Sequence, residues 1–176
     1  MNFADPKGNV LQLGLREGMK VADVGAGSGH YALAAAAIVG GEGRVYAIDV
    51  QEDMLKHVHD AALAKHLRNV ETIWGDGEKV NGTTLRDRSI DAAILSNTLF
   101  QAHDKPGIVG ELKRILKSGG KLLVIDWAGA YGGLGPDPKH VVSEHAAEEL
   151  FIGGGFHKAK DFRAGPHHYG IVFTAP

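Results

Sequence analysis

The residues best suited to chemistry in this chain lie in one glycine-rich turn. Residues 20–32 read KVADVGAGSGHYA, in which Asp23 precedes three alternating glycines, Gly25, Gly27 and Gly29. Glycines remove the Cβ atoms that would keep a ligand from the backbone, and they permit the positive φ angles of a tight turn. The helix expected after the turn begins with free N–H groups, which favour electron-rich or anionic ligand groups. This stretch therefore predicts a cradle for a nucleotide-like ligand.

A second acid follows at a fixed distance from the turn. Asp49 ends the apolar run 44–49 and lies 20 residues after Gly29. A carboxylate at the tip of the second strand of a doubly wound sheet can accept hydrogen bonds from both hydroxyls of a ribose. Its alternative role is the N-cap of a helix expected over 51–65, and the two roles are compatible. Asp49 thus indicates a ribose without identifying the cofactor.

A third acid follows a third apolar run. Residues 70–74 read VETIW, and the next residues are Gly75, Asp76 and Gly77. A simple turn built on Asp and Gly explains this segment by itself. It does not explain why three acids or glycine clusters follow three successive strands. The spacing favours one ligand site built from all three segments.

The elements that would position these residues alternate along the chain. Short apolar runs and helical patterns in alternation are typical of an α/β protein. The expected strands are 21–24, 44–49, 70–74, 89–96, 122–126, 158–163 and 169–174, and the expected helices are 31–39, 51–65, 105–116 and 143–151. Residues 117–121 are expected to form a turn.

Length and composition favour one globular domain. The 176 residues predict a single domain over 1–176, with an N-terminal arm, a short helix or extended segment, at 1–18 and a glycine- and proline-rich loop at 129–142. A net charge of −2 provides no general attraction to nucleic acid or acidic membranes. No run of about 18 apolar residues occurs, so no membrane span is expected. These features predict a cytoplasmic protein.

The residue types also bear on metal and redox chemistry. The chain has no cysteine, which excludes disulfides, thiolate metal sites and cysteine nucleophiles. His57, His59 and His66 lie close in sequence, but no pair has the i, i+4 spacing of helical metal ligands. No metal site is therefore expected.

The turn resembles motif I of the class I S-adenosylmethionine (SAM)-dependent methyltransferases. The pattern is Asp23-x-Gly25-x-Gly27-x-Gly29, whereas a dinucleotide fingerprint would place glycine at His30. Residues 112–126, LKRILKSGGKLLVID, resemble a second signature of these enzymes, although serine replaces the usual proline before the two glycines. The C-terminal segments are similar to those of the small ubiquinone and sterol methyltransferase-like subgroup.

The resemblance implies a fold, a cofactor and a set of contacts. It implies a doubly wound, Rossmann-like sheet of seven strands that is mostly parallel, with a parallel sixth strand and an antiparallel last strand. SAM would be the methyl donor and S-adenosylhomocysteine (SAH) the product. Asp76 and Gly77 would contact the adenine, and Ser96 and Asn97 would lie beside the methyl group. The implied cofactor-binding residues are Asp23, Gly25, Ala26, Gly27, Gly29, Asp49, Val50, Met54, Asp76, Gly77, Ser96 and Asn97.

The implied reaction is attack by an O, N, C or S atom of an acceptor, expected to be a small molecule, on the methyl group. Alignment and desolvation can supply most of the catalysis, so neither a metal nor a covalent intermediate is required. If the acceptor must lose a proton, the candidate bases are His103, Asp126, His167 and His168. Arsenite methylation is disfavoured because thiolate ligands are absent. Adenine or glutamine N-methylation is disfavoured because the chain reads SNTL after its fourth strand.

Two other classes of function remain open at this stage. A non-catalytic SAM-binding protein would have the same motifs. An NAD-dependent oxidoreductase would share the fold and Asp49, but the residue at His30 and the Asp76 segment count against it. RNA methylation finds no basic stripe to support it. Homodimerisation is left open, because a second subunit could complete the acceptor site.

Overall fold

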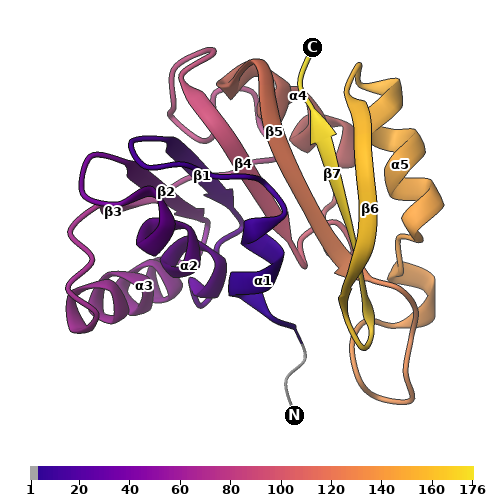
Figure 1. Cartoon of the computed structure of the whole chain (residues 1–176). Coiled ribbons are helices and arrows are strands. Elements are labelled where there is room, and N and C mark those ends of the chain that lie inside the picture. Colours follow the sequence, from indigo (N-terminus) through magenta and orange to yellow (C-terminus); the bar gives the residue numbers. More distant parts are fainter. Residues whose placement is uncertain (1–3) are drawn as a thin grey trace.

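A seven-stranded sheet with helices on both faces forms the centre of the structure (Figure 1). The computed structural model describes residues 4–176. In chain order the elements are α1 Pro6–Leu11, β1 Lys20–Val24, α2 His30–Val39, β2 Arg44–Asp49, α3 Glu52–Ala64, β3 Val70–Trp74, β4 Ile90–Ser96, α4 Lys105–Ile115, β5 Leu116–Trp127, η1 Pro138–His140, α5 Glu144–Gly153, β6 His157–Gly165 and β7 His168–Thr174.

The order of the strands confirms the predicted fold class. The sheet order is β3-β2-β1-β4-β5-β7-β6, and β1 to β5 pair in parallel. β7 is antiparallel to both of its neighbours, so β6 runs in the same direction as β5. The chain order reverses between β1 and β4. Ligands of doubly wound sheets bind at such a reversal, beyond the carboxyl ends of the strands.

Alternation of side chains along β1 divides the interior into two cores. Ala22 and Val24 face a core that includes residues of α4 and α5, whereas Val21 faces a core with α1 and α2. Because successive side chains of a strand point to opposite faces, Asp23 shares the face of Val21. The two faces of β1 therefore meet different helices.

Each core has its own packing. In the first, the ring centroids of Phe151 and Phe173 lie 5.1 Å apart, and those of Phe151 and Phe156 lie 5.6 Å apart edge to face. In the second, small fully buried side chains such as Ala32 and Ala35 let α2 approach the sheet closely. The result is a sheet between two layers of helices, as Figure 1 shows.

The predicted N-terminal arm contains a docked helix. Asp5 caps α1 by accepting a 3.1 Å hydrogen bond from Gly8 N–H. The buried Asn9 side chain donates to Tyr31 Oη at 3.1 Å and to the carbonyl of Ala164 at 2.9 Å. These bonds tie α1 to α2 and β6. Residues 1–3 of the predicted arm lie outside the described residues.

The largest difference from the predicted elements concerns β5. The strand starts at Leu116 instead of 122, and α4 ends at Ile115. The expected turn at 117–121 is part of the strand, because Leu116 pairs with Ile90 and the register then shifts before Ala92 pairs with Lys121. The prediction of a separate turn was therefore wrong; the glycine pair forms an irregularity within a paired strand.

A buried carboxylate holds the loop that follows β3. Glu111 of α4 accepts hydrogen bonds from Asn81 N–H at 2.9 Å, Thr83 N–H at 3.1 Å and Thr83 Oγ1 at 2.6 Å. Arg114 donates to the same carboxylate at 2.7 Å. Burial alone would raise the pKa of Glu111, but the hydrogen bonds from Arg114 and Thr83 outweigh it and lower the pKa to about 2. This bonding fixes the loop that carries Asp76.

The glycine-rich segment 129–142 is folded by local contacts. An isolated bridge joins Tyr131 to Leu134, and the segment contains η1 near its end. The ring centroids of Tyr131 and His167 lie 4.2 Å apart. Next to this contact, the ring centroids of Trp127, at the end of β5, and His168, at the start of β7, lie 4.3 Å apart. The segment is thereby held against the turn between β6 and β7.

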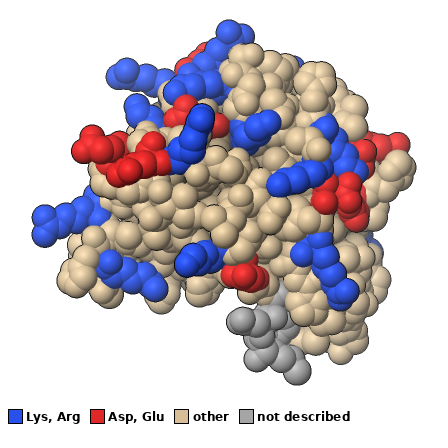
Figure 2. All heavy atoms as spheres, in the orientation of Figure 1, with Lys and Arg blue, Asp and Glu red and all other residues tan. Residues whose placement is uncertain are grey.

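The surface carries charges of both signs. Figure 2 shows Lys and Arg side chains interspersed with Asp and Glu on one face of the molecule. Within residues 4–176, no helix combines the length and the apolar character needed to cross a bilayer.

Gly29 offers a test of how the turn is packed. It has φ +79°, and an added Cβ would lie 2.7 Å from Val58 Cγ2. We expect Gly29→Ala to lower the free energy of unfolding by about 1–3 kcal/mol, measured by urea denaturation. Gly110→Ala is the matched control, because Gly110 is exposed in α4 and has no atom near an added Cβ. It should stabilise by about 0.5–1 kcal/mol. Equal effects of the two substitutions would contradict this account.

Candidate active site

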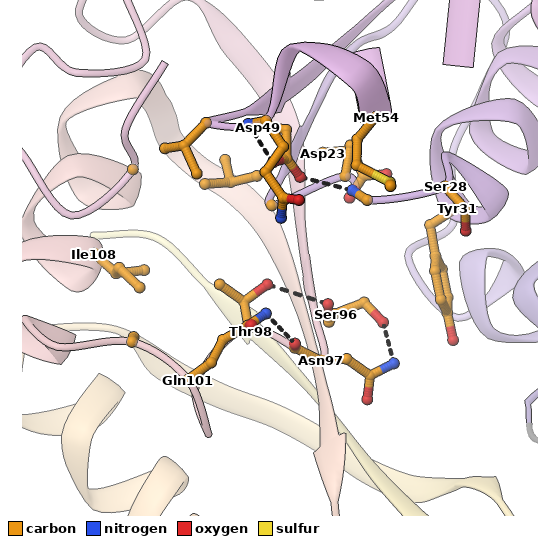
Figure 3. A pocket seen from close by; sticks show the side chains of 18 of the residues that line it. Asp23, Ser28, Tyr31, Asp49, Met54, Ser96, Asn97, Thr98, Gln101 and Ile108 are labelled. Carbon is orange, nitrogen blue, oxygen red and sulfur yellow. Dashed lines mark hydrogen bonds between the residues drawn. The ribbon is translucent and has the colours of Figure 1, made fainter. Parts of the chain in front are cut away.

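A cleft of about 760 Å³ opens at the carboxyl ends of β1, β2 and β4 (Figure 3). It lies where the strand order reverses, as expected for this sheet. All the predicted cofactor-binding residues except Gly29 line it. They are Asp23, Gly25, Ala26, Gly27, Asp49, Val50, Met54, Asp76, Gly77, Ser96 and Asn97. The structure thus brings together residues from four separate chain segments.

The glycine-rich turn has the backbone conformation that the sequence predicts. Gly25, Gly27 and Gly29 have φ angles of +74°, +48° and +79°. A Cβ on Gly25 would lie 2.5 Å from Thr98 Oγ1, so the turn also needs glycine there for its packing against the segment after β4. Gly29 is buried at the N-cap of α2, against Val58. Its role in the structure is the close packing of α2 against α3.

Asp49 connects the glycine-rich turn to α3. Its Oδ2 accepts a 2.8 Å hydrogen bond from Gly27 N–H, and its Oδ1 accepts a 3.0 Å bond from Gln51 N–H. The N-cap residue of α3 is Gln51, so the alternative prediction of an N-cap at Asp49 was wrong. Each carboxylate oxygen has a second lone pair. The side chain can therefore accept ligand hydroxyls while it holds the turn.

Asp76 and Gly77 form the wall of the cleft beyond β3. Asp76 accepts from Glu78 N–H at 3.0 Å and forms an ion pair with Lys79 at 3.0 Å. Partial burial alone would raise the pKa of Asp76, but the hydrogen bonds from Lys79 and Glu78 N–H lower it overall. A Cβ on Gly77 would lie 2.5 Å from Val24 Cγ1, so glycine lets this loop pack against β1. The wall presents an ionised acceptor beside an accessible backbone.

Two acceptor atoms in the cleft wall are buried without a hydrogen-bond partner among residues 4–176. They are Asp23 Oδ2 and Asn97 Oδ1. Burial raises the pKa of Asp23 to about 7, although the backbone N–H of Ala32 opposes the shift, and the charge of Asp49 adds to it. Asn97 has φ +54°, a costly conformation for a residue other than glycine. Unpaired buried acceptors and backbone strain at one place are typical of a ligand site.

The structure adds cleft residues that the sequence did not single out. Tyr31 lies on α2, and its hydroxyl is at the end of the ring nearer to Ser96 and Asn97 (Figure 3). Burial raises the pKa of Tyr31. Hydrogen bonds from Asn9 and Ser96 act in the opposite direction but do not cancel this rise. Further lining residues include Ser28, His30, Glu78, Thr98, Gln101 and Ile108. The sequence could have indicated most of them only by position, because they lie beside residues that were predicted to bind the cofactor.

The four predicted base candidates lie outside the lining of this cleft. Asp126 is fully buried on the α4 and α5 side of β5, where it accepts from Trp127 N–H at 2.8 Å and Phe100 N–H at 3.3 Å. Burial raises the pKa of Asp126 to about 6, against these backbone hydrogen bonds. His103 lines a smaller hollow nearby, and His167 and His168 contact aromatic rings.

No metal site accompanies the cleft within the described part of the chain. Residues 4–176 contain no group of three or more His, Asp or Glu side chains arranged to hold a metal ion.

Comparisons with known proteins point to one family. The family model described as "Methyltransferase domain" matches residues 15–160. A solved SAM-dependent methyltransferase from Aquifex aeolicus superposes with a TM-score of 0.89 at 30% identity, covering 99% of this chain and 91% of that one. The arsenic(III) SAM methyltransferase CrArsM from Chlamydomonas reinhardtii has a TM-score of 0.72 at 23% identity, covering 90% of this chain and 63% of its own. That last likeness concerns the fold alone.

A curated relative is similar over part of its length. The ubiquinone/menaquinone biosynthesis C-methyltransferase UbiE of Pseudomonas entomophila is 31% identical over 116 residues, which is 65% of this chain. The aligned part is 44% of that relative, so the chain spans less than half of the enzyme it matches.

Asp49 gives a direct test of the cleft. We expect Asp49→Ala to weaken SAM binding by about 1–3 kcal/mol, roughly 5- to 150-fold in Kd, because charged hydrogen bonds are lost. Calorimetric titration measures the change. Asp60→Ala serves as the control, since Asp60 is exposed on α3 and does not line the cleft. Unchanged affinity in Asp49→Ala would remove this residue from the site.

Proposed function

The chain belongs to the class I SAM-dependent methyltransferases, and on this basis we propose that it transfers a methyl group from SAM to a small-molecule acceptor. SAH is the second product. The observation that carries the proposal is the convergence of Gly27, Asp49 and Asp76 on one cleft that also contains unpaired buried acceptors. Neither the acceptor of UbiE nor that of CrArsM transfers to this chain by similarity alone.

The residues of the cleft fit SAM in three parts. Asp76 and the backbone of Gly77 suit the adenine, with Val50 and Met54 as apolar walls. Asp49 suits the ribose hydroxyls, because both of its oxygens have lone pairs left.

The third part of SAM, its methionine moiety, carries an ammonium group that suits the buried acceptor atoms of the cleft wall. An ammonium group has three donors and no acceptor. Asp23 Oδ2 and Asn97 Oδ1 are buried acceptors that have no partner among residues 4–176. An N–H donor of the ligand's ammonium group at either atom would remove the cost of leaving that atom unpaired. This fit favours an amino acid moiety at the β1 and β4 ends.

The chemistry requires little beyond alignment. When bound, SAM supplies a methyl carbon whose bond to sulfur breaks with the electron pair left on sulfur, while an acceptor atom forms the new bond. The cleft walls hold the reactants in line and exclude water, which can contribute on the order of 7–11 kcal/mol in favourable cases. Tyr31 and Asn97 border the region where the acceptor would approach.

A base is needed only where the acceptor loses a proton during transfer. We propose His30 for this role beside the predicted candidates, His103, Asp126, His167 and His168. His30 is exposed at the first position of α2 and lines the cleft. Its imidazole makes no hydrogen bond or ion pair with the part of the chain that the structure describes, so its ring nitrogens are available. An imidazole is suited to accept a proton near neutral pH.

A single domain and a cytoplasmic location stay predictions from the sequence. Homodimerisation stays an open alternative. The net charge of −2 supports a small-molecule acceptor over nucleic acid. A non-catalytic SAM-binding protein is the second candidate, because the cofactor part of the cleft is better defined by the motifs than the acceptor part.

Parallel calorimetric titrations with SAM, SAH and NAD test the proposed function. We expect micromolar binding of SAM and SAH, and no binding of NAD, because the glycine at the third fingerprint position is replaced by His30. Binding of NAD alone would overturn the assignment. Binding of SAM with no turnover against a broad panel of acceptors would favour the non-catalytic alternative.

The pH dependence of binding tests Asp23. Its pKa of about 7 means that the folded protein binds this proton more tightly than the unfolded chain, so the stability it contributes is lost as the pH rises from 3.8 to 7. Ligand cations prefer the ionised carboxylate. We expect SAM affinity to rise up to about tenfold from pH 6 to pH 8, as the ionised fraction increases. Calorimetry at the two pH values should show this rise in the wild type and in Asp60→Asn, but not in Asp23→Asn. A rise that persists in Asp23→Asn would contradict the assignment.

A further inference from the structure

A second hollow, of about 460 Å³, adjoins the cofactor cleft. It lies between the segment after β4 and the end of the glycine-rich segment. Its lining residues are Phe100, Gln101, Ala102, His103, Lys105, Lys139, His140, Val141 and Val142. Gln101 and Ala102 line the cofactor cleft as well. The two spaces therefore share one wall, and a molecule seated in the hollow can extend toward the cleft past Gln101.

The titratable side chains that line the hollow are all basic. They are Lys105, Lys139, His103 and His140, and no Asp or Glu is among the lining residues. The whole chain has a net charge of −2, so this hollow differs in sign from the protein as a whole. Clustered cations at the wall of a low-dielectric depression attract small anions.

The carboxylates near the hollow do not occupy all the N–H groups of its two lysines, so donors remain for a ligand. Lys139 pairs with Asp137 at 3.5 Å, but both side chains are largely exposed, so the pair is weak. Lys105 Nζ donates to the carbonyl of Ala102 at 2.8 Å, and two of its three N–H groups remain for a ligand. Asp126 lies close enough for the charge of Lys105 to lower its pKa. Asp126 is itself occupied by backbone N–H groups.

Glu78 and Asp104 are two further carboxylates near the hollow. Glu78 Oε2 accepts hydrogen bonds from the backbone N–H groups of His103 at 3.0 Å and Asp104 at 2.6 Å. Asp104 in turn accepts from Gly107 N–H as the N-cap of α4. Both carboxylates thus hold the backbone around His103 in place and leave the basic side chains available.

The hollow also has an apolar side and a fixed shape. Phe100, Val141 and Val142 are half-buried in its wall. Phe100 N–H is bonded to Asp126, and Tyr169 Oη donates to the carbonyl of Val142 at 3.1 Å. Both walls are thereby attached to the end of the sheet formed by β5 and β7. A preformed site with a few polar groups and an apolar surface is typical of small-molecule recognition.

We propose that this hollow binds the anionic group of the methyl acceptor, which is then a small molecule with a carboxylate or phosphate on an apolar body. The inference rests on the proposed function, because it assigns the acceptor side of the same site. Lys105 and Lys139 bind the anionic group, and Phe100, Val141 and Val142 contact the apolar body. The part of the acceptor that receives the methyl group extends past Gln101 into the cofactor cleft.

Binding of simple anions to the ¹⁵N-labelled protein tests the proposal. The probes are benzoate, its neutral analogue benzamide, and inorganic phosphate, each added up to about 20 mM, within the range of millimolar affinity. We expect benzoate or phosphate to shift the backbone amide signals of residues 100–105 and 139–142, and benzamide to bind at least about fivefold more weakly than benzoate. Saturation by benzoate indicates a carboxylate acceptor, and saturation by phosphate alone indicates a phosphorylated one.

Charge-matched variants locate the site. We expect Lys105→Gln combined with Lys139→Gln to weaken anion binding about tenfold or more. Lys56→Gln combined with Lys65→Gln is the control, because both lysines are exposed, in α3 and at its C-cap, and neither lines the hollow. An amide spectrum of each variant that matches the wild type verifies folding. Lys139→Gln alone is the fallback variant, since the Lys139 side chain is exposed and its ion-pair partner is the exposed side chain of Asp137.

Several outcomes would overturn the proposal. They are an absence of shifts at the hollow with both anions, equal binding of benzoate and benzamide, and equal losses in the two double variants. Titration with SAM is measured separately on the same samples. Anion binding without SAM binding would refute the assignment of the hollow to a methyl acceptor, whereas SAM binding without anion binding would refute this inference and leave the proposed function intact.

Discussion

The Asp49 carboxylate accepts hydrogen bonds from the backbone N–H groups of Gly27 and Gln51. The position of the cleft depends on these two hydrogen bonds. The glycine-rich turn has a left-handed backbone that would be strained in other residues. A bond from the end of β2 holds that turn against the neighbouring strand. The same carboxylate retains acceptor capacity toward the cleft. One side chain thus supports the turn and faces the ligand.

Two buried carboxylates show how surroundings determine a role. Glu111 is saturated by Arg114, Thr83 and backbone N–H groups, so its pKa is low and it fastens the loop after β3. Asp23 has few such bonds, so burial dominates and raises its pKa to about 7. The first group stabilises the frame of the cleft. The second is left incompletely paired in its wall, which suits a cationic ligand.

Strand alternation determines which polar groups can reach the cofactor. Asp23 and Ser96 lie on strand positions that face α2, where Tyr31 also lies. Asp126 is a comparable acid one residue before the end of the neighbouring strand β5, but its position faces α4 and α5. It accepts a hydrogen bond from the backbone after β4. A shift of one residue reverses the face of a side chain. Asp126 therefore supports the wall of the second hollow, although the sequence suggested a base.

Much of this arrangement could be predicted from the sequence, because it is set by local pattern. The fold class follows from alternating apolar runs and helices, and the turn conformation follows from glycine at Gly25, Gly27 and Gly29. The spacing to Asp49 and Asp76 predicted residues that the structure brings to one cleft. Successive parallel strands place their carboxyl ends at one edge, so position along the chain is enough.

Tertiary structure alone decided the rest. The burial of Asp23, the pairing of Glu111 with the loop after β3, and the hollow between Phe100 and Lys139 each join segments far apart in sequence. The four predicted bases illustrate the limit of prediction from the sequence. They were chosen for their side-chain chemistry, but none of them lines the cofactor cleft. Motifs record local backbone and spacing, whereas burial, pKa and the sharing of a wall depend on which distant side chains pack together.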